Sequence, residues 1–411
     1  MKSHVSTGTA PGRIRVAVFN THPIQYYAPL WRKLAGFGDM GVTVYYGSDF
    51  SVRGYRDKEF EEDVVWDVPL LEGYDFRYLD GFGKVDGSSF FRPGPRSAVK
   101  ALLAGRPDAV VMTAYHAAFW YGIAAAAAVV GSRVVMRHDA SDEAYGSRGI
   151  KRAVRAVILR SLYRSVSHFA VVGERAKRHL RKFGVGESRM SWSPFCVNSD
   201  WVESQRVEWM GRRADLREAL GIGKDDVALL FCGKLIEKKD PLVLIEAIRR
   251  LPDRASLHLV VAGSGPLGTE VEDAGRSVLG DRLHMLGFLN QAEIGRAYAV
   301  GDVFVLPSRA RETWGLVVNE AMQFGLPAVV SDAVGCHDDL VPDTGTGRVF
   351  RAGDAGGLAC ALGSLMAEFP GGQARYAGAC RARAAQYSLD AAAAGMREAI
   401  LAACGRPAKP I

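Results

Sequence analysis

The sequence predicts an α/β protein whose two domains each contain a doubly wound parallel sheet. A chain of 411 residues is too long for one hydrophobic core and fits two domains of ordinary size. Short apolar runs alternate with helical patterns along most of the chain, which is typical of parallel sheets covered by helices. The alternation is interrupted at Pro194 to Asn198, which we interpret as the linker. We therefore expect two Rossmann-like domains that face each other across a cleft.

The first domain is expected over residues 13–197. The alanine-rich window Ala117 to Gly131 falls short of the roughly twenty residues that a membrane-spanning helix needs, so it predicts a buried helix. The polar residues 1–12 lack the apolar core of a signal peptide and predict a disordered tail. Pro29 to Leu34 has a helical pattern. The predicted strands are Arg13 to Asn20, Val42 to Tyr46, Ala109 to Met112, Arg133 to Met136 and His168 to Val172.

The second domain is expected over residues 198–386. It repeats the alternation of strands and helices without repeating the sequence, and Pro241 to Leu251 is one of its helical patterns. An alanine-rich helix is predicted from Tyr387 to Cys404, within a separate C-terminal segment 387–411. The predicted strands are Ala228 to Cys232, Leu257 to Ala262, His284 to Leu286, Val303 to Leu306, Ala328 to Val330 and Gly347 to Phe350.

The composition is that of a soluble globular protein, with 48% apolar and 24% charged residues. The six cysteines show neither two-residue spacing nor nearby histidine pairs, which argues against a zinc cage or a disulfide framework. We therefore expect free thiols, a reducing compartment, a cytoplasmic location and no metal site.

Positive charge is concentrated in the first half of the chain. Residues 1–198 carry 28 Lys and Arg against 18 Asp and Glu, a net charge of +10, whereas the remainder carries −3. No acid occurs between Glu143 and Glu174, and the basic residues of 151–164 surround apolar ones, which predicts an amphipathic basic helix. Such a helix favours peripheral contact with an anionic membrane. No aromatic stacking pattern interleaves the arginines, so we expect no nucleic-acid partner.

Two glutamates flank a predicted helix start in the second domain. The apolar run Val303 to Leu306 is followed by a short polar loop and then by a helix whose first turn carries Gly315. The unpaired amides and the positive dipole end of such a helix suit a phosphate. Glu312 precedes the helix, where it could reach sugar hydroxyls, and Glu320 lies about two turns inside, where it could hold a ribose diol. A purely structural role remains open, because glutamates near helix starts also complement the dipole.

The stretch Pro307 to Met322 resembles the glutamate, seven residues, glutamate signature of the family 4 retaining glycosyltransferases, which have the GT-B fold. The resemblance is densest from Phe231 to Phe350. It implies a metal-independent, retaining transfer of a sugar from a nucleoside diphosphate sugar, with uridine or guanosine diphosphate expected, to a small-molecule or lipid acceptor. It also implies that the final helix crosses back onto the first domain.

The resemblance assigns the diphosphate to two lysines that follow the strand ending at Cys232. The family uses an arginine and, five residues on, a lysine; Lys234 and Lys239 match these positions, although a lysine cannot reproduce the two-pronged contact of an arginine. Cations here would neutralise the negative charge that grows on the leaving group. Lysines before a helix are also commonly solvated, so this alternative stays open. The helix-start amides expected to hold the same group are those of Trp314, Gly315, Leu316 and Val317.

Two further segments are expected to line the nucleotide. Gly263, Ser264 and Gly265 follow a predicted strand and resemble the glycine-x-glycine-proline turn of the family. The resemblance implies that main-chain atoms around Phe288 grip the base, which is why side chains do not reveal the base. A tight turn and a core phenylalanine are the structural alternatives.

Two strand ends of the first domain carry candidate polar groups. His138 lies at the carboxyl edge of the predicted sheet, where open parallel sheets bind ligands, and the resemblance places a histidine there beside the transferring sugar. Asp139 is expected to orient His138 or to cap the next helix. His116 ends the preceding strand and is a second acceptor-side candidate.

The loop after the first strand departs from the family pattern. Many members carry paired glycines there, whereas this chain carries the bulky polar residues His22, Gln25 and Tyr26. We expect these side chains on the acceptor side, with Val64 to Tyr74 as a second wall.

Three other functions remain open from the sequence. A nucleotide-sugar epimerase of the same double-Rossmann shape would convert the donor without an acceptor. A dehydrogenase using Gly263 to Gly268 is less favoured, because no acidic residue is convincingly placed for its ribose. A membrane-binding protein without catalysis would use the basic helix alone.

Overall fold

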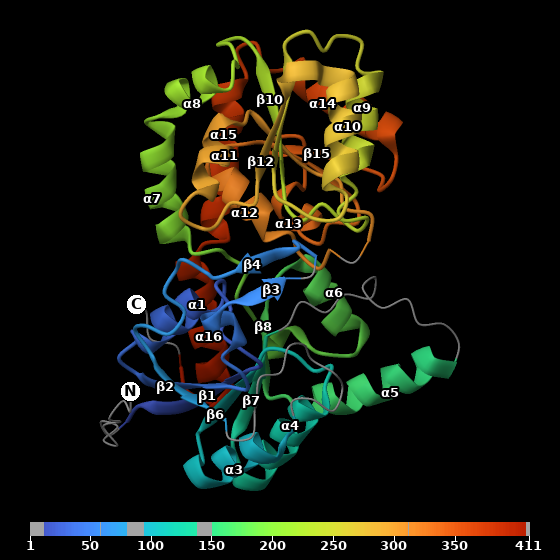
Figure 1. Cartoon of the computed structure of the whole chain (residues 1–411). Coiled ribbons are helices and arrows are strands. Elements are labelled where there is room, and N and C mark those ends of the chain that lie inside the picture. Colours follow the sequence, from blue (N-terminus) through green and yellow to red (C-terminus); the bar gives the residue numbers. More distant parts are fainter. Residues whose placement is uncertain (1–11, 58, 80–93, 138–149, 311, 408–411) are drawn as a thin grey trace.

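The computed structural model describes residues 12–57, 59–79, 94–137, 150–310 and 312–407. Within these ranges the chain forms two parallel sheets and one two-stranded antiparallel hairpin. Figure 1 shows the second domain above the first, with the hairpin at their junction. The predicted disordered tail over 1–12 lies outside the described residues except for Gly12.

The first sheet has seven strands in the order β5-β2-β1-β6-β7-β8-β9, and all its pairs are parallel. The five predicted strands are present. The two edge strands were not predicted, because β9 has only three residues and β5 alternates two aromatic residues with charged ones instead of forming an apolar run. The strands are β1 (Ile14–Asn20), β2 (Met40–Tyr46), β5 (Asp75–Tyr78), β6 (Ala109–Met112), β7 (Arg133–Met136), β8 (His168–Val171) and β9 (Met190–Trp192).

Helices cover both faces of the first sheet. The alanine-rich window forms a helix, as predicted, and its Phe119, Trp120 and Ile123 are buried, although Val129 is exposed. Among the described residues, no helix combines the length and the apolar character needed to cross a bilayer. The helices are α1 (Ala28–Ala35), α2 (Phe50–Arg53), α3 (Arg96–Gly105), α4 (Ala118–Val130), α5 (Ile150–Ser165) and α6 (Glu174–Lys182), with a short 3-10 turn at Glu187–Arg189.

The second sheet has six strands in the order β12-β11-β10-β13-β14-β15, again all parallel. Every predicted strand of this half is present. β11, β13 and β14 are buried at every residue, as expected for a parallel sheet covered on both faces, whereas β12 and β15 are only partly buried. The strands are β10 (Val227–Cys232), β11 (Leu257–Ala262), β12 (Leu283–Gly287), β13 (Val303–Leu306), β14 (Ala328–Ser331) and β15 (Gly347–Phe350).

Nine helices in the described part of the second half pack around this sheet. One 3-10 turn at Gly280–Arg282 leads into β12. The helices are α7 (Ser199–Met210), α8 (Arg213–Ala219), α9 (Pro241–Arg250), α10 (Gly268–Leu279), α11 (Ile294–Val300), α12 (Leu316–Gln323), α13 (His337–Leu340), α14 (Ala355–Met366) and α15 (Gln373–Gln386).

The last helix, α16 (Leu389–Ala403), packs on the first domain rather than on the second. Its Met396 and Ile400 share a buried core with Ile14 and Val18 of β1. At Gly395, an added Cβ would lie 1.7 Å from the carbonyl oxygen of Trp192, so glycine allows the helix to approach β9 closely. The helix therefore supplies one layer of the first domain's core.

The strand order of each sheet reverses beside its first strand, with β1 between β2 and β6 and β10 between β11 and β13. Ligands of open parallel sheets bind at such switch points, outside the carboxyl ends of the strands. In this chain the loop after β1 meets the helix that follows β13, since Gln25, Tyr26 and Glu320 of α12 line one cavity. The fold thus brings the two switch points to the same interdomain cleft.

Candidate active site

The loops that follow β10 and β13 are joined at the switch point of the second sheet. The backbone amide of Arg309 donates to the carbonyl of Lys238 at 2.9 Å. The Arg309 side chain forms an ion pair of 2.5 Å with the buried carboxylate of Asp240. These contacts fix the lysine-containing loop beside the loop that carries Glu312.

Glu312 and Lys239 form an ion pair across these two loops. Their side chains are 12% and 14% exposed, so the pair is largely removed from water but open on one side. Ser308 Oγ donates to the same Glu312 oxygen, Oε2, at 3.2 Å. A carboxylate with two fixed partners on one oxygen is oriented, and its other oxygen is available to a polar ligand.

Glu320 lies in the middle of α12 and is 3% exposed. Its Oε2 accepts a hydrogen bond of 2.6 Å from the hydroxyl of Tyr298, whereas its buried Oε1 has no hydrogen-bond partner. Burial raises the pKa of the Glu320 carboxyl to about 7, and the Tyr298 hydrogen bond offsets only part of this effect. A buried carboxyl oxygen without a partner is costly, which indicates a site that a hydroxyl-bearing ligand completes.

The cavity next to Glu320 lies between the domains and has a volume of about 190 Å³. It is lined on the first-domain side by Gln25 and Tyr26, and on the second-domain side by Asn198 and Trp201. Burial and the nearby Glu320 raise the pKa of the Tyr26 hydroxyl well above its ordinary value, so this group is a neutral hydrogen-bond donor. Two of the three residues predicted after β1, Gln25 and Tyr26, therefore line the same cavity as Glu320, the residue predicted to bind the ribose.

The start of α12 is shaped by a glycine, as the sequence predicts. Gly315 has a φ of +100°, and an added Cβ would lie 3.0 Å from Leu306. Trp314 precedes it with a buried side chain that donates to Asn319 at 2.8 Å and packs 5.3 Å from the Phe195 ring. The Trp314 side chain thus anchors the helix start against the linker. The contribution predicted for Trp314, as for Leu316 and Val317, is therefore that of its backbone amide.

The glycine turn after β11 packs on the lysine loop. An added Cβ on Gly263 would lie 1.9 Å from the carbonyl oxygen of Gly233, and one on Gly265 would lie 2.8 Å from that of Leu235. Both glycines also have a φ close to +150°. The contact between the two loops therefore requires glycine at both positions. Contact of this turn with a nucleotide stays a prediction.

The remaining first-domain candidates do not all reach the cavity. His22 packs 4.4 Å from the Phe50 ring, and burial lowers its pKa to about 4, which makes it neutral. His116 is exposed before α4. His138 and Asp139 lie outside the described residues. The preceding Arg137 is 1% exposed and donates to the carbonyl of Pro194 at 2.8 Å, which ties the end of β7 to the linker.

Lys234 has partners that the sequence does not predict. Its ammonium donates to both carboxylate oxygens of Asp57 at 3.0 Å and to Glu59 at 2.7 Å. Burial alone would lower the pKa of Lys234, but the hydrogen bonds of Glu59 and Asp57 outweigh it and the pKa is raised. Tyr298, Ser308 and these two acids are the residues of the site that sequence reasoning missed. No local motif marks them, because they meet the predicted residues only through the tertiary fold.

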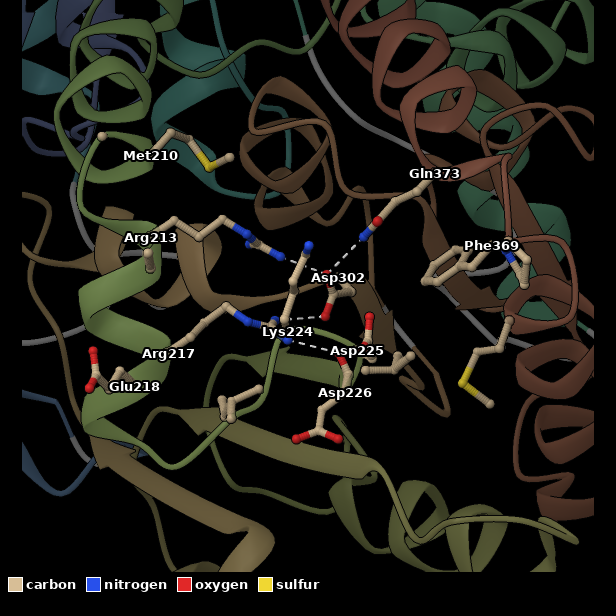
Figure 2. Close-up of a pocket in the computed structure, with 16 residues that line it drawn as sticks. Met210, Arg213, Arg217, Glu218, Lys224, Asp225, Asp226, Asp302, Phe369 and Gln373 are labelled. Atoms are coloured by element: carbon tan, nitrogen blue, oxygen red, sulfur yellow. Dashed lines mark hydrogen bonds and ion pairs between the residues drawn. The ribbon is translucent and has the colours of Figure 1, made fainter.

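A second cavity, of about 990 Å³, lies at the opposite edge of the second sheet and is shown in Figure 2. Its polar side chains converge on Asp302, which accepts from Arg213 at 2.6 Å, Arg217 at 2.8 Å and Gln373 at 2.9 Å. These contacts hold α8 and α15 against the amino ends of β10 and β13. The polar residues of this cavity therefore join parts of the second domain, and none of them belongs to the predicted donor site.

Solved structures with the same fold match nearly the whole chain. A glycosyltransferase from Rickettsia africae has a TM-score of 0.70 at 12% identity, covering 95% of this chain and 98% of that one. Anabaena HepE, solved in complex with UDP and glucose, has a TM-score of 0.66 at 16% identity, covering 94% and 99%. Two parallel α/β domains with their switch points at a common cleft define a protein of the GT-B fold, as predicted.

Two family models match consecutive parts of the sequence. The model described as Glycosyltransferase Family 4 matches residues 40–201, and the model described as Glycosyl transferases group 1 matches residues 212–373. The chain belongs to the family 4 glycosyltransferases.

Curated relatives resemble a part of the chain. A D-inositol 3-phosphate glycosyltransferase from Xylanimonas cellulosilytica is 31% identical over 227 residues, 54% of each chain. The matches to this relative and the next two cover 54%, 34% and 46% of the relatives' own lengths. The chain therefore spans about half or less of the length of these relatives.

Proposed function

We propose that the protein is a metal-independent, retaining glycosyltransferase that moves a sugar from a nucleoside diphosphate sugar to a small-molecule or lipid acceptor. The observation that carries this proposal is the pair of carboxylates before and within α12. Glu312 is oriented by Lys239 and Ser308, and Glu320 presents a buried oxygen without a partner. The first suits the hydroxyls of a sugar, and the second suits the hydroxyls of a ribose.

The diphosphate would lie between these carboxylates, against the amides at the start of α12 and the ammonium of Lys239. The first amides of a helix have no partner within the helix, and its dipole favours an anion there. The ammonium would stabilise the charge that develops on the leaving diphosphate. We propose a uridine or guanosine nucleotide, and the UDP-bound structures of Anabaena HepE support the first of these.

Transfer with retention follows if the acceptor attacks from the face that the diphosphate leaves. The departing phosphate oxygen would then accept the proton of the acceptor hydroxyl, and this chain would supply no separate base. Glu312 would hold the sugar ring, and Tyr26 and Gln25 would lie on the acceptor side of Glu320. His22 and His116 remain acceptor-side candidates, with His138 and Asp139 beyond the described residues.

We predict that a nucleoside diphosphate will stabilise the protein without a divalent metal. At a concentration of about 100 times Kd, a bound ligand stabilises the folded state by about 2.7 kcal/mol. Thermal-shift measurements with uridine, guanosine and adenosine diphosphates, each with and without EDTA, test this expectation. Free nucleosides are the control for diphosphate recognition. A shift that EDTA abolishes would contradict metal independence, and the absence of any shift would contradict the donor class.

The epimerase alternative has a direct test. Incubation of the protein with the stabilising nucleotide sugar alone should leave the sugar configuration unchanged, whereas an epimerase would convert it. With an acceptor present, nuclear magnetic resonance of the product should show the anomeric configuration of the donor. An inverted product would contradict the retaining mechanism.

We also propose that the first domain docks on an anionic membrane surface through α5. We propose a cytoplasmic location for the protein, because all six cysteines are free thiols and thiols stay reduced in the cytoplasm. Leu159 and Leu162 of α5 pack inward, whereas Val154, Val157 and Ile158 are 52%, 66% and 45% exposed. Exposed basic residues at positions 160 and 164 lie on the same helix. Figure 1 shows α5 on the outer side of the first domain, away from the second. An apolar strip with basic neighbours fits lipid acyl chains and anionic headgroups.

We predict that α5 controls membrane binding. The protein should float with vesicles containing phosphatidylglycerol at low salt and should bind pure phosphatidylcholine vesicles less. The double variant Val157→Glu/Ile158→Glu should lose most of this binding, because it places two charges in the apolar strip. Val207→Glu, at a 63% exposed position on α7 of the other domain, is the matched control. Equal flotation of the parent protein and the α5 variant would contradict the proposal.

A further inference from the structure

The segment Tyr55–Pro69 of the first domain lies across the donor-binding features of the second domain. It begins with the antiparallel hairpin of β3 (Tyr55–Asp57) and β4 (Glu62–Val64), and the structure describes all of it except residue 58. Figure 1 shows this hairpin at the junction of the two domains. We name the whole segment the strap.

The first contact of the strap neutralises Lys234. The Lys234 ammonium has three donor hydrogens, and it makes three described hydrogen bonds, two to Asp57 and one to Glu59. Both acceptors are carboxylates, which carry the same sign of charge as a diphosphate. The strap therefore occupies all three hydrogen-bond donors of the lysine that the proposed donor diphosphate needs.

The second contact covers the glycine turn and Phe288. Ser264 Oγ donates to the carbonyl of Phe60 at 2.9 Å, and the Phe60 ring lies 5.0 Å from that of Phe288 in an edge-to-face arrangement. An added Cβ on Gly265 would lie 2.8 Å from the carbonyl oxygen of Glu59, which shows how closely the strap backbone approaches the turn. These are the two segments expected to line the nucleotide.

The third contact closes the strap over the cavity beside Glu320. The Asn290 side chain donates to the carbonyl of Val65 at 2.6 Å, and the amide of Ala292 donates to Asp67 at 3.0 Å. The following residues, Val68 and Pro69, line the same cavity as Glu320. The strap thus spans the site from the lysine loop to the proposed ribose ligand.

The strap is held by contacts that a stronger ligand can replace. A two-stranded hairpin with three residues in each strand is marginally stable without further packing. Glu59 is 60% exposed, so its ion pair with Lys234 is weak, whereas the Asp57 pair, with side chains 13% and 23% exposed, is the main contact that the ligand must replace. A diphosphate presents several oxygens on one compact group and can also use the helix-start amides, which Asp57 and Glu59 do not contact in the described hydrogen bonds.

We propose that the strap is an autoinhibitory element: Asp57 and Glu59 occupy Lys234 in place of the donor diphosphate, and the strap must leave Lys234 before the donor binds. This inference rests on the proposed function, because it takes Lys234 as a diphosphate ligand. The apparent affinity for the donor is then reduced by the fraction of molecules in which the strap is closed.

The first test compares affinities in three proteins: the parent, Asp57→Asn/Glu59→Gln, and the matched control Glu61→Gln/Glu62→Gln. Glu61 and Glu62 are exposed residues of the same hairpin, so the control removes the same charge without touching Lys234. Uridine diphosphate, guanosine diphosphate and inorganic pyrophosphate are titrated by calorimetry. The Asp57→Asn/Glu59→Gln variant should bind its best ligand and pyrophosphate with a Kd roughly fivefold lower than the parent, and the control should match the parent.

The outcomes are distinct. Equal affinity in all three proteins overturns the strap proposal and leaves the proposed function standing. Weaker binding by Asp57→Asn/Glu59→Gln also overturns it, because the two acids would then help to build the donor site. If no protein binds any of the three probes, the proposed function fails and the strap proposal fails with it.

A second measurement follows the strap directly. Arg56 is exposed on β3, and trypsin cleavage after it can be identified by mass spectrometry. Saturating ligand should accelerate this cleavage in the parent, and Asp57→Asn/Glu59→Gln should be cleaved faster than the parent without ligand. Protection of the strap by ligand would show that it closes over the donor, which is the opposite of the proposal.

Discussion

Replacing Lys239 with alanine should weaken binding of the nucleoside diphosphate by about ten- to a hundredfold. Hydrogen bonds to charged groups contribute about 1.5–3 kcal/mol, and the Lys239 side chain is only 14% exposed, so its charge is screened little. The same change releases Glu312, whose carboxylate loses its ion-pair partner. Sugar transfer should therefore fall further than donor binding. Calorimetric titration measures the first effect, and initial rates at saturating donor measure the second.

Lys238→Ala is the matched control for this prediction. Lys238 is the neighbouring lysine, its side chain is exposed, and its described contact with Arg309 runs through its carbonyl, which alanine keeps. It should bind the donor like the parent. The double variant Lys239→Ala/Glu312→Gln removes the unpaired charge and separates a loss of folding from a loss of binding. Equal donor affinity in Lys239→Ala and Lys238→Ala would remove Lys239 from the proposed diphosphate site.

Replacing Glu320 with glutamine should change how stability depends on pH. The folded-state pKa of Glu320 is raised from 4.5 to about 7, so the folded protein retains a proton that the unfolded chain releases. Glu320 therefore favours folding most below pH 4.5, and this contribution is lost as pH rises from 4.5 through about 7. At about 1.36 kcal/mol per pKa unit, the free energy of unfolding should fall by about 2–3 kcal/mol between pH 5 and pH 8 through this group. The glutamine variant should lack this loss.

Urea unfolding of the parent and of Glu320→Gln at pH 5 and pH 8 measures the difference. Any cost of placing an amide beside Tyr298 is the same at both pH values, so the change between them isolates the titration. Glu293→Gln, at an exposed position before α11, is the control and should follow the parent. Parallel pH profiles for Glu320→Gln and the parent would contradict the raised pKa of this carboxyl.

The strands that the sequence predicted are those whose residues are apolar at nearly every position. β11 and β13 are buried at every residue, so burial and sequence pattern coincide there. β3 and β4 are polar strands that no periodic pattern marks, and β3 contacts the other domain through Asp57. We expected Val64 to Tyr74 only as an acceptor wall, whereas its first residues belong to the strap.

Part of the candidate site could likewise be predicted from the sequence, and part could not. The proximity of Lys239 to Glu312 could be predicted because both residues follow buried strands that adjoin in the sheet, although the Ser308 contact with Glu312 was not predicted. The partners of Lys234 could not, because Asp57 and Glu59 reach it from the other domain. On α5 the sequence predicted one amphipathic face, but the tertiary fold buries Leu162 and leaves Val157 in solvent. Local patterns specify an element and its polarity, and the packing partner decides which apolar residues are covered.

The return of α16 to the first sheet has a consequence for biosynthesis. During translation this helix leaves the ribosome after both sheets have emerged, although Met396 and Ile400 complete the core around β1. Domains commonly fold in order from the N-terminus, but here the earlier domain must wait for a late part of the chain. Until then its apolar surface is open to water, which makes the nascent protein a candidate client for chaperones that shield such surfaces.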